Sequence, residues 1–274
     1  MSRYSSDPLD GWTKSGRALA ASRAAEKSDA PQFMQRSTSM AATTVTYAIG
    51  DIHGCYDHLL HLLSLCKIHS RGRASRFVFL GDYIDRGPDS RKVVDFLIRA
   101  ETLSPRQFVC LKGNHEELFS IAAADASDSQ RMAWFQNGGE ETMESYDVTD
   151  PSDIPERHRI WLSSRPVTWN DGKRLFVHAG IRPGVPLDQQ KERELLWIRE
   201  PFLSSEIDHG VLIVHGHTPT RSGWPDIRNN RVNLDTGACF GRRLTAAAFN
   251  DEQLMPLAIL NDAGPISEFP FTQS

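Results

Sequence analysis

The chain has 274 residues, of which 39% are hydrophobic, and its formal net charge is -4. This size and composition are typical of one globular domain with a buried core. The acidic balance excludes a global basic field of the kind that holds nucleic acid, and no apolar run approaches the roughly 20 residues that cross a bilayer. We therefore predict neither a nucleic-acid partner nor a membrane partner, and any recognition of phosphate must be local.

The first 42 residues are rich in Ser, Ala and Arg and poor in large aliphatic side chains. Such a segment buries too little apolar surface to offset its ordering entropy, so we predict a mobile tail. Arg23 interrupts the alanine-rich stretch, which argues against a secretory signal. Residues 43–274 are then expected to form a single domain.

From Val45 onward, short β-branched or aromatic runs alternate with segments of helical periodicity, which is an α/β pattern. The predicted strands are 44–49, 76–80, 108–111, 174–177 and 211–214. The predicted helices are 56–66, 90–103, 116–124 and 155–162. Three later strands, 231–234, 244–249 and 254–260, are expected to be antiparallel.

The four cysteines, Cys55, Cys66, Cys110 and Cys239, show no CxxC spacing. A chain of this size folds without disulfide bonds, so we predict reduced thiols in a cytoplasmic protein. Cys55 lies beside a motif described below, but nothing near it in sequence marks an activated thiolate, and packing is the preferred interpretation.

A polar motif follows each of the first five predicted strands. The motifs are GDIHG at 50–54, GDYIDRG at 81–87, GNHE at 113–116, HAG at 178–180 and HGHT at 215–218. One such motif alone is weak evidence, because an isolated Asp-x-His is more often an aspartate in a turn beside a structural histidine. Five in register at the carboxyl ends of strands, where the loops of an α/β sheet converge, predict side chains that meet.

Carboxylate and imidazole ligands without thiolate suit divalent manganese, iron, zinc or cobalt. A carboxylate can also bridge two ions. Two ions about 3.5–4 Å apart suit phosphoryl transfer, because they activate water and stabilise charge on the phosphate oxygens. The motifs therefore predict a two-metal hydrolase that acts on phosphate esters.

In their order and spacing, these motifs resemble those of the phosphoprotein phosphatase family of metallophosphoesterases, over roughly residues 45–249. The segments WIRE at 197–200, DTGA at 235–238 and NGG at 137–139 are similar to those of compact bacterial serine/threonine phosphatases and of bacteriophage lambda phosphatase. The resemblance implies a calcineurin-like metallophosphoesterase fold, in which a two-sheet β sandwich is flanked by helices, and makes residues 43–274 the catalytic domain.

The resemblance also implies two divalent metal ions, with manganese preferred over iron or zinc. The implied metal ligands are Asp51, His53, Asp82, Asn114, His178 and His217. The first two would hold one ion, the last three the other, and Asp82 would bridge both. Arg86 and Arg199 would clamp the phosphate, and His115, oriented by Asp85, would protonate the leaving oxygen.

The implied reaction is a one-step in-line attack on phosphorus by a hydroxide that bridges the two ions. The leading substrate is phosphoserine or phosphothreonine in a protein. One alternative is an enzyme resembling the symmetrical bis(5'-nucleosyl)-tetraphosphatases, which cleave a phosphoanhydride. Another is a catalytically inactive scaffold of the same fold, although no ligand or acid is missing from the motifs.

Several neighbours of the motifs keep two interpretations. His215 either touches substrate or has a structural role, and Glu116 serves either the first turn of its helix or the chemistry. Trp134, Trp161, Trp169 and Trp224 could line a substrate cleft, but a lone tryptophan lies more often in the core or at its rim. The sequence leaves the oligomeric state open.

Overall fold

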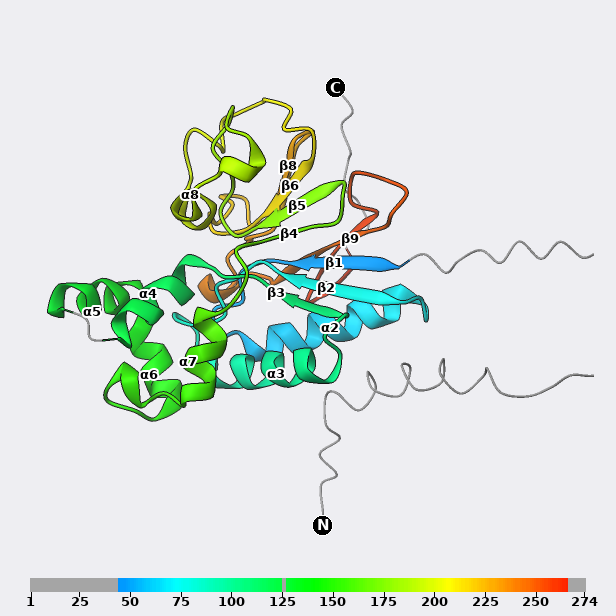
Figure 1. Ribbon diagram of the computed structural model, residues 1–274. Coiled ribbons are helices and arrows are strands. Elements are labelled where there is room, and N and C mark those ends of the chain that lie inside the picture. Colours follow the sequence, from blue (N-terminus) through cyan, green and yellow to red (C-terminus); the bar gives the residue numbers. More distant parts are fainter. Residues whose placement is uncertain (1–43, 125–126, 266–274) are drawn as a thin grey trace, which may run out of the picture.

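The computed structural model describes residues 44–124 and 127–265 (Figure 1). The expected tail, residues 1–42, lies outside the described residues. Two β-sheets lie face to face, and helices cover the outer face of each sheet. The prediction of an α/β fold with two sheets flanked by helices is confirmed. In the described ranges, no helix is both long and apolar enough to span a membrane.

The first sheet has six strands in the order β11-β10-β9-β1-β2-β3. Their bounds are β1 Val45–Ile49, β2 Ser75–Phe79, β3 Phe108–Cys110, β9 Thr245–Phe249, β10 Ala258–Asn261 and β11 Gly264–Pro265. Strands β1, β2 and β3 are parallel, whereas β9 and β10 pair antiparallel, as expected for the later part of the chain. The predicted strand 254–260 begins later than expected, at Ala258.

The second sheet has five strands in the order β4-β5-β6-β8-β7. Their bounds are β4 Thr168–Asn170, β5 Arg174–Val177, β6 Leu212–His215, β7 Asp226–Ile227 and β8 Arg231–Asn233. The expectation that 231–234 is antiparallel was wrong with respect to its inner neighbour, because β8 runs parallel to β6. The short strand β7 lies at the edge of the sheet. A tight turn after it leads to β8, which pairs antiparallel with β7 and lies between β6 and β7.

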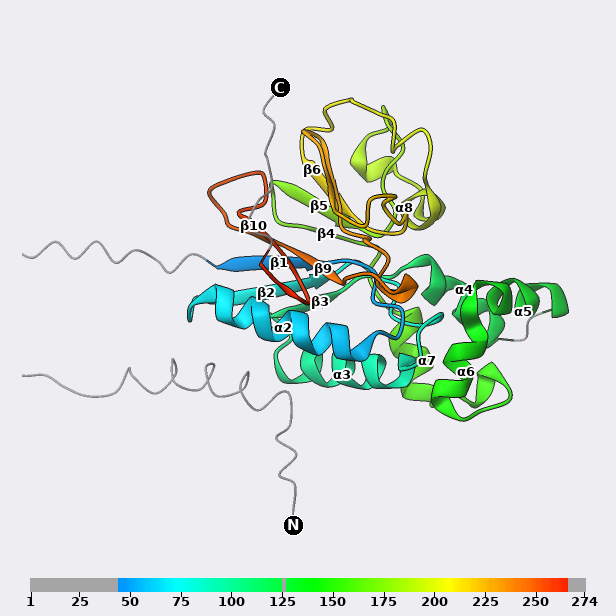
Figure 2. The ribbon, with the colours of Figure 1, turned by 180° about the vertical axis from the view of Figure 1, so that it is seen from behind.

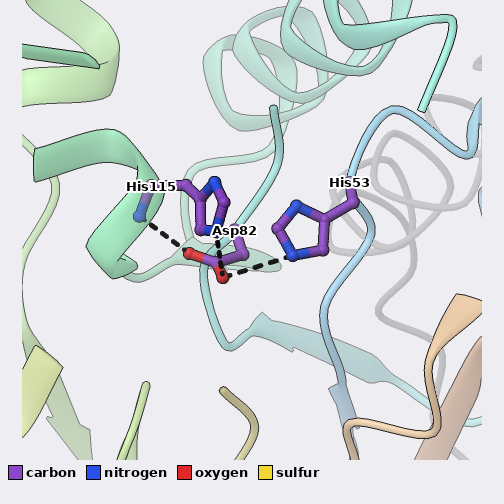
Figure 3. A group of neighbouring side chains, drawn as sticks. All are labelled: His53, Asp82 and His115. Carbon is purple, nitrogen blue, oxygen red and sulfur yellow. Dashed lines mark hydrogen bonds and ion pairs between the residues drawn. The ribbon is translucent and has the colours of Figure 1, made fainter. Parts of the chain in front are cut away.

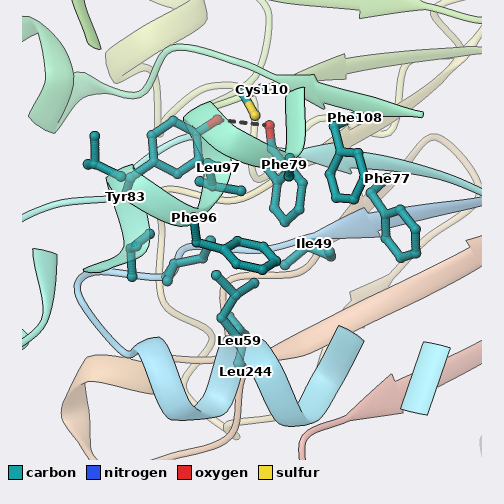
Figure 4. Packing of buried hydrophobic residues seen from close by; sticks show 14 of the residues in the cluster. Ile49, Leu59, Phe77, Phe79, Tyr83, Phe96, Leu97, Phe108, Cys110 and Leu244 are labelled. Atoms are coloured by element: carbon teal, nitrogen blue, oxygen red, sulfur yellow. Dashed lines mark hydrogen bonds between the residues drawn. The ribbon is translucent and has the colours of Figure 1, made fainter. Parts of the chain in front are cut away.

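The hydrophobic core is divided by the first sheet, because side chains of a strand alternate between its two faces. On β1, Tyr47 and Ile49 face the helices, while Ala48 faces the second sheet. Several aromatic rings lie on the helix side, where Phe77 and Phe108 stack with centroids 5.3 Å apart (Figure 4). The sheet is therefore buried on both faces, which fixes its register.

Two long helices, α2 (Tyr56–Ser70) and α3 (Ser90–Leu103), cover the outer face of the first sheet, as Figure 2 shows from behind. On α3 the residues Val93, Leu97 and Ala100 recur at helical spacing and are buried. This periodicity explains why the sequence predicted α3.

A group of shorter helices lies beyond the carboxyl ends of β1, β2 and β3 (Figure 1). It comprises α4 Asn114–Ala122, α5 Asp128–Trp134, α6 Glu140–Tyr146 and α7 Glu156–Ser163. The sequence indicated α4 and α7, shifted by one or two residues, but not α5 or α6. The π-helical turn η1 (Phe135–Gly139), with Gly138 at φ 95°, joins α5 to α6.

The second sheet carries α8 (Glu192–Trp197) on its outer face, where Leu195 and Ile198 pack against strand residues such as Ile213. This helix has only six residues, and the sequence did not predict it. Three single turns of 3-10 helix complete the elements: η2 Pro151–Asp153, η3 Leu187–Gln189 and η4 Ala238–Phe240.

Candidate active site

The five motifs meet at one end of the two sheets, where β1, β2, β3, β5 and β6 end. Eight of the ten predicted site residues are buried, with at most 7% of their surface exposed: Asp51, His53, Asp82, Asp85, Asn114, His115, His178 and His217. Arg86 is half-buried and Arg199 is exposed. Burying so many polar groups together is costly unless they compensate one another or bind a charged ligand.

Asp82 lies at the centre of this cluster, and its two carboxylate oxygens face different motifs. Oδ2 lies 3.4 Å from Nε2 of His53, and Oδ1 lies 3.3 Å from Nε2 of His178. His115 approaches from a third side, with its Nε2 3.8 Å from Oδ2 and its backbone N–H donating to Oδ1 at 3.1 Å. Figure 3 shows His53 and His115 on either side of Asp82.

His53, Asp82 and His115 form a first group, in which one donor atom from each lies within 4.8 Å of the others. The Nδ1 of His53 donates to the carbonyl of Ile84 at 2.8 Å, which turns Nε2 toward Asp82. Asp51 lies outside this group. Its two oxygens accept the backbone N–H of His217 at 3.2 and 3.0 Å.

Asp82, His178 and His217 form a second group with the same ligand-like spacing. The amide oxygen of Asn114 completes it, 2.8 Å from Nε2 of His178 and 2.8 Å from Nδ1 of His217. His178 donates its Nδ1–H to the carbonyl of Leu80 at 2.8 Å. Burial lowers the pKa of His178 and so favours its neutral form, in which Nε2 presents a lone pair.

The lone pair of His178 points at two oxygens, on Asn114 and Asp82, rather than at a hydrogen-bond donor. These three atoms repel one another unless a cation lies between them. Imidazole, amide and carboxylate ligands together suit a divalent ion. The carbonyl that holds the far nitrogen of His178 is the usual outer support of a metal-binding histidine. The residues present therefore fit the implied metal.

The site contains three buried carboxyl groups that influence one another, those of Asp51, Asp82 and Asp235. Burial, followed by the charges of Asp235 and Asp82, raises the pKa of Asp51 well above its usual range. Burial also raises the pKa of Asp235 to about 6, while the neighbouring histidines outweigh burial at Asp82 and lower its pKa. Such a concentration of acidic groups favours bound cations. Asp235 lies outside the five motifs, so the sequence indicated no role for it beyond its place in the DTGA segment.

His115 and Asp85 form a buried pair, in which Nδ1 of the histidine donates to the carboxylate at 2.7 Å. The same carboxylate accepts the indole N–H of Trp134 at 3.0 Å and the hydroxyl of Thr142 at 2.6 Å. Burial raises the pKa of Asp85, and these two donors oppose the increase. Burial also lowers the pKa of His115 to about 3.

The role of Trp134 and Thr142 in this pair is not evident from the sequence. They lie 49 and 57 positions from Asp85, on α5 and α6, which the sequence did not predict. Trp134 is fully buried against the Asp85 carboxylate, so it does not line a cleft.

Glu116 ties two motifs together through the backbone. Its carboxylate accepts the N–H groups of Asp82 at 2.9 Å, Tyr83 at 2.8 Å and Gly113 at 2.8 Å. Burial raises its pKa to about 8, against the effect of these three donors. Glu116 therefore serves the first turn of α4, as one interpretation expected, and it also holds the loop that carries Asp82.

Arg86 lies beside the first group, with Nη1 2.9 Å from Nε2 of His53. Its backbone N–H donates to the carbonyl of Gly138 at 3.0 Å, and a Cβ at position 138 would lie 2.7 Å from that nitrogen. The π-helical turn therefore supports Arg86 at close range. Arg199 follows α8 on the other side, where it contributes, after burial and His178, to the low pKa of His217, about 3.

Most of the remaining candidates pack against neighbouring residues. His215 is buried and packs edge-on against Phe202 at 5.1 Å between centroids. Burial raises the pKa of Cys55 to about 11, so a thiolate is not populated at neutral pH. Trp161 donates to Glu101, and Trp169 packs on the ring of Phe176. Trp224, by contrast, is exposed over 52% of its surface.

Comparison with known proteins agrees with this geometry. Residues 45–248 match the family of calcineurin-like phosphoesterases. The chain is 29% identical over 229 residues to the asymmetrical bis(5'-nucleosyl)-tetraphosphatase PrpE of Anoxybacillus flavithermus, which covers 73% of this chain and 89% of that protein. It is 32% identical over 213 residues to serine/threonine-protein phosphatase 1 of Salmonella typhimurium, covering 73% and 90%.

The fold is also similar to the solved structure of a protein serine/threonine phosphatase from Saccharomyces cerevisiae. The TM-score is 0.52 at 18% identity, over 85% of this chain and 83% of that chain. At this identity the likeness concerns the fold alone. The family match spans most of the chain, and with the buried ligand groups it leads to one conclusion: the protein belongs to the calcineurin-like phosphoesterase family and is a metal-dependent phosphatase.

Proposed function

We propose that this protein is a serine/threonine protein phosphatase whose site holds two divalent ions, preferably manganese. The proposed ligands are Asp51, His53, Asp82, Asn114, His178 and His217. The observation that carries the proposal is the placement of Asp82, whose two oxygens face a histidine of each ligand group. This placement is what a bridging carboxylate requires, and it also argues against an inactive scaffold.

Divalent ions bound there supply Lewis-acid activation of water and of the phosphate. The chain itself orients the ligands. His53 and His178 each donate Nδ1–H to a backbone carbonyl, which fixes the ring so that Nε2 faces Asp82. Glu116 restrains the backbone of Asp82 from behind. The ligands are thus held before substrate arrives, so little binding energy is lost in ordering them.

Arg86 and Arg199 are proposed to hold the phosphate, because guanidinium groups bind two oxygens at once. Arg86 already reaches the first ligand group, 2.9 Å from His53. The exposed side chain of Arg199 is free to approach from the other side. Together they would orient the phosphorus for in-line attack and neutralise part of the substrate charge.

His115 is proposed to give a proton from Nε2 to the leaving oxygen. Its Nδ1–H is held by Asp85, so Nε2 carries a proton only in the imidazolium form. Burial disfavours that form, whereas a phosphate dianion beside the ring would favour it. Nε2 of His115 lies 3.8 Å from Oδ2 of Asp82. The ring is therefore close enough to the proposed metal site to reach the leaving oxygen of a bound phosphate.

The relatives support two substrates. The Salmonella protein phosphatase, at 32% identity, supports the phosphoprotein, and the PrpE proteins support hydrolysis of dinucleoside polyphosphates as the second candidate. We favour the phosphoprotein because the segment from Trp197 to Glu200 resembles that of compact protein phosphatases.

The test compares kcat/KM for a phosphothreonine peptide and for diadenosine tetraphosphate in the presence of Mn²⁺. We expect the peptide to be the better substrate and Asp82→Asn to lose activity on both. A higher kcat/KM for the dinucleotide would replace the first candidate with the second. Full activity of Asp82→Asn would contradict the proposed site.

A further inference from the structure

Two aromatic side chains are conspicuously exposed in the described part of the chain, Trp224 at 52% and Phe240 at 59%. Both lie on loops that leave strands of the second sheet, after β6 and after β8. Single exposed apolar residues are common and need no explanation. Phe240 differs because its ring contacts a residue of the proposed active site. The guanidinium carbon of Arg86 lies 5.6 Å from the centre of the Phe240 ring.

The backbone holds Phe240 on a short, anchored turn. Gly237 and Gly241 flank the turn with φ of 80° and 75°, values that favour glycine. The N–H of Phe240 donates to the carbonyl of Gly237 at 3.0 Å, and the N–H of Gly237 donates to the buried carboxylate of Asp235 at 3.1 Å. The backbone that carries the ring is therefore anchored to a buried carboxylate of the site. Less conformational entropy is then lost when a ligand packs on the ring.

Arg86 connects this ring to the reacting centre. Its guanidinium carbon lies over the Phe240 ring, while Nη1 reaches Nε2 of His53 at 2.9 Å. A phosphate held by Arg86 would therefore place its ester group near the exposed face of Phe240. If that group carries a planar ring, the two rings would bury apolar surface and stack.

We propose that Phe240 is a specificity-determining residue: among phosphorylated substrates it favours those that carry a planar ring near the phosphate. The inference rests on the proposed phosphatase function and on Arg86 as a phosphate ligand. The ligand chemistry is a π ring joined to a phosphate ester or anhydride. An aryl phosphate carries such a ring directly, and a dinucleoside polyphosphate carries it as a nucleobase.

The experiment uses ratios, so that a general loss of activity cancels. For each variant of the full chain with Mn²⁺, kcat/KM is measured for phenyl phosphate, diadenosine tetraphosphate and ring-free glycerol 2-phosphate. Phe240→Leu keeps an apolar side chain without the ring, and Phe240→Tyr is the matched control that keeps the ring. We expect the ratio of a ring-bearing substrate to glycerol 2-phosphate to fall about fivefold to tenfold in Phe240→Leu and to be retained in Phe240→Tyr.

A fall for phenyl phosphate alone would place the ring next to the phosphate, and a fall for the dinucleotide alone would identify a nucleobase. Either result supports the proposal. An unchanged ratio for both substrates in Phe240→Leu, or an equal fall in Phe240→Tyr, would overturn it. The preference for a phosphothreonine peptide is measured separately on the wild-type protein, so loss of the proposed protein-phosphatase function would not be mistaken for loss of the role of Phe240.

Discussion

Replacing Thr142 by valine tests the hydrogen bonds that hold Asp85. The change removes one hydroxyl from a fully buried position and keeps the shape of the side chain. That hydroxyl donates to Oδ1 of Asp85 at 2.6 Å and accepts the backbone N–H of Asp85 at 2.8 Å. Neither group of Asp85 is left alone, because Trp134 still donates to the carboxylate and Ser90 still accepts the N–H.

A hydrogen bond to a charged group contributes about 1.5–3 kcal/mol, and the remaining partners limit the further cost of unsatisfied groups. We therefore expect Thr142→Val to lower the free energy of unfolding by about 2–3 kcal/mol. The pKa of Asp85 should also rise, since the Thr142 hydroxyl opposes the effect of burial. The His115 ring would then be less firmly oriented, so kcat should fall while KM changes little.

Urea unfolding at neutral pH with saturating Mn²⁺ measures the stability change. Thr102→Val is the matched control, because the Thr102 hydroxyl donates to the carbonyl of Ile98 on the exposed face of α3. We expect that control to lie within about 0.5 kcal/mol of the wild type. If Thr142→Val lowers the free energy of unfolding no more than Thr102→Val does, the Thr142 hydroxyl does not stabilise Asp85. An unchanged kcat would show that this hydroxyl does not help to orient His115.

Three further predictions concern other parts of the structure. His115→Asn should keep its metal but lose more activity on a phosphothreonine peptide than on an aryl phosphate, whose leaving oxygen needs little protonation; equal losses would argue against His115 as the acid. Gly216→Ala should lower activity at least about tenfold, because its Cβ would lie 2.0 Å from Oδ1 of Asp51, and metal content should fall in parallel. Burial lowers the pKa of His158, so the unfolded chain takes up a proton near pH 6.5 before the folded chain does. Stability should therefore be complete above pH 6.5 and decrease below it, and the drop in Tm between pH 7.5 and 5.5 should be smaller in His158→Gln than in the wild type.

Much of the fold follows from periodicity that is local in the sequence. The β-branched and aromatic runs predicted β1, β2 and β5, and the apolar spacing of α3 predicted a helix with the observed bounds. The short helices α5, α6 and α8 have six or seven residues each, too few for a clear period of 3.6. The parallel pairing of β8 with β6 depends on the insertion of a strand between two others, which no local pattern reveals.

The site shows the same division. Asp51, Asp82 and Asn114 were singled out because each lies in a motif that comes soon after a strand, and the structure brings these motifs together. Their roles as ligands stay predictions. Trp134 and Thr142 could not be found in this way, because they reach Asp85 only through tertiary packing.

We propose that two cations share Asp82. X-ray diffraction from crystals grown with Mn²⁺, with anomalous scattering, would locate these ions. We expect two ions about 3.5–4 Å apart, each bound by one oxygen of Asp82. A single ion, or two ions that do not share this carboxylate, would exclude a bridging role for Asp82.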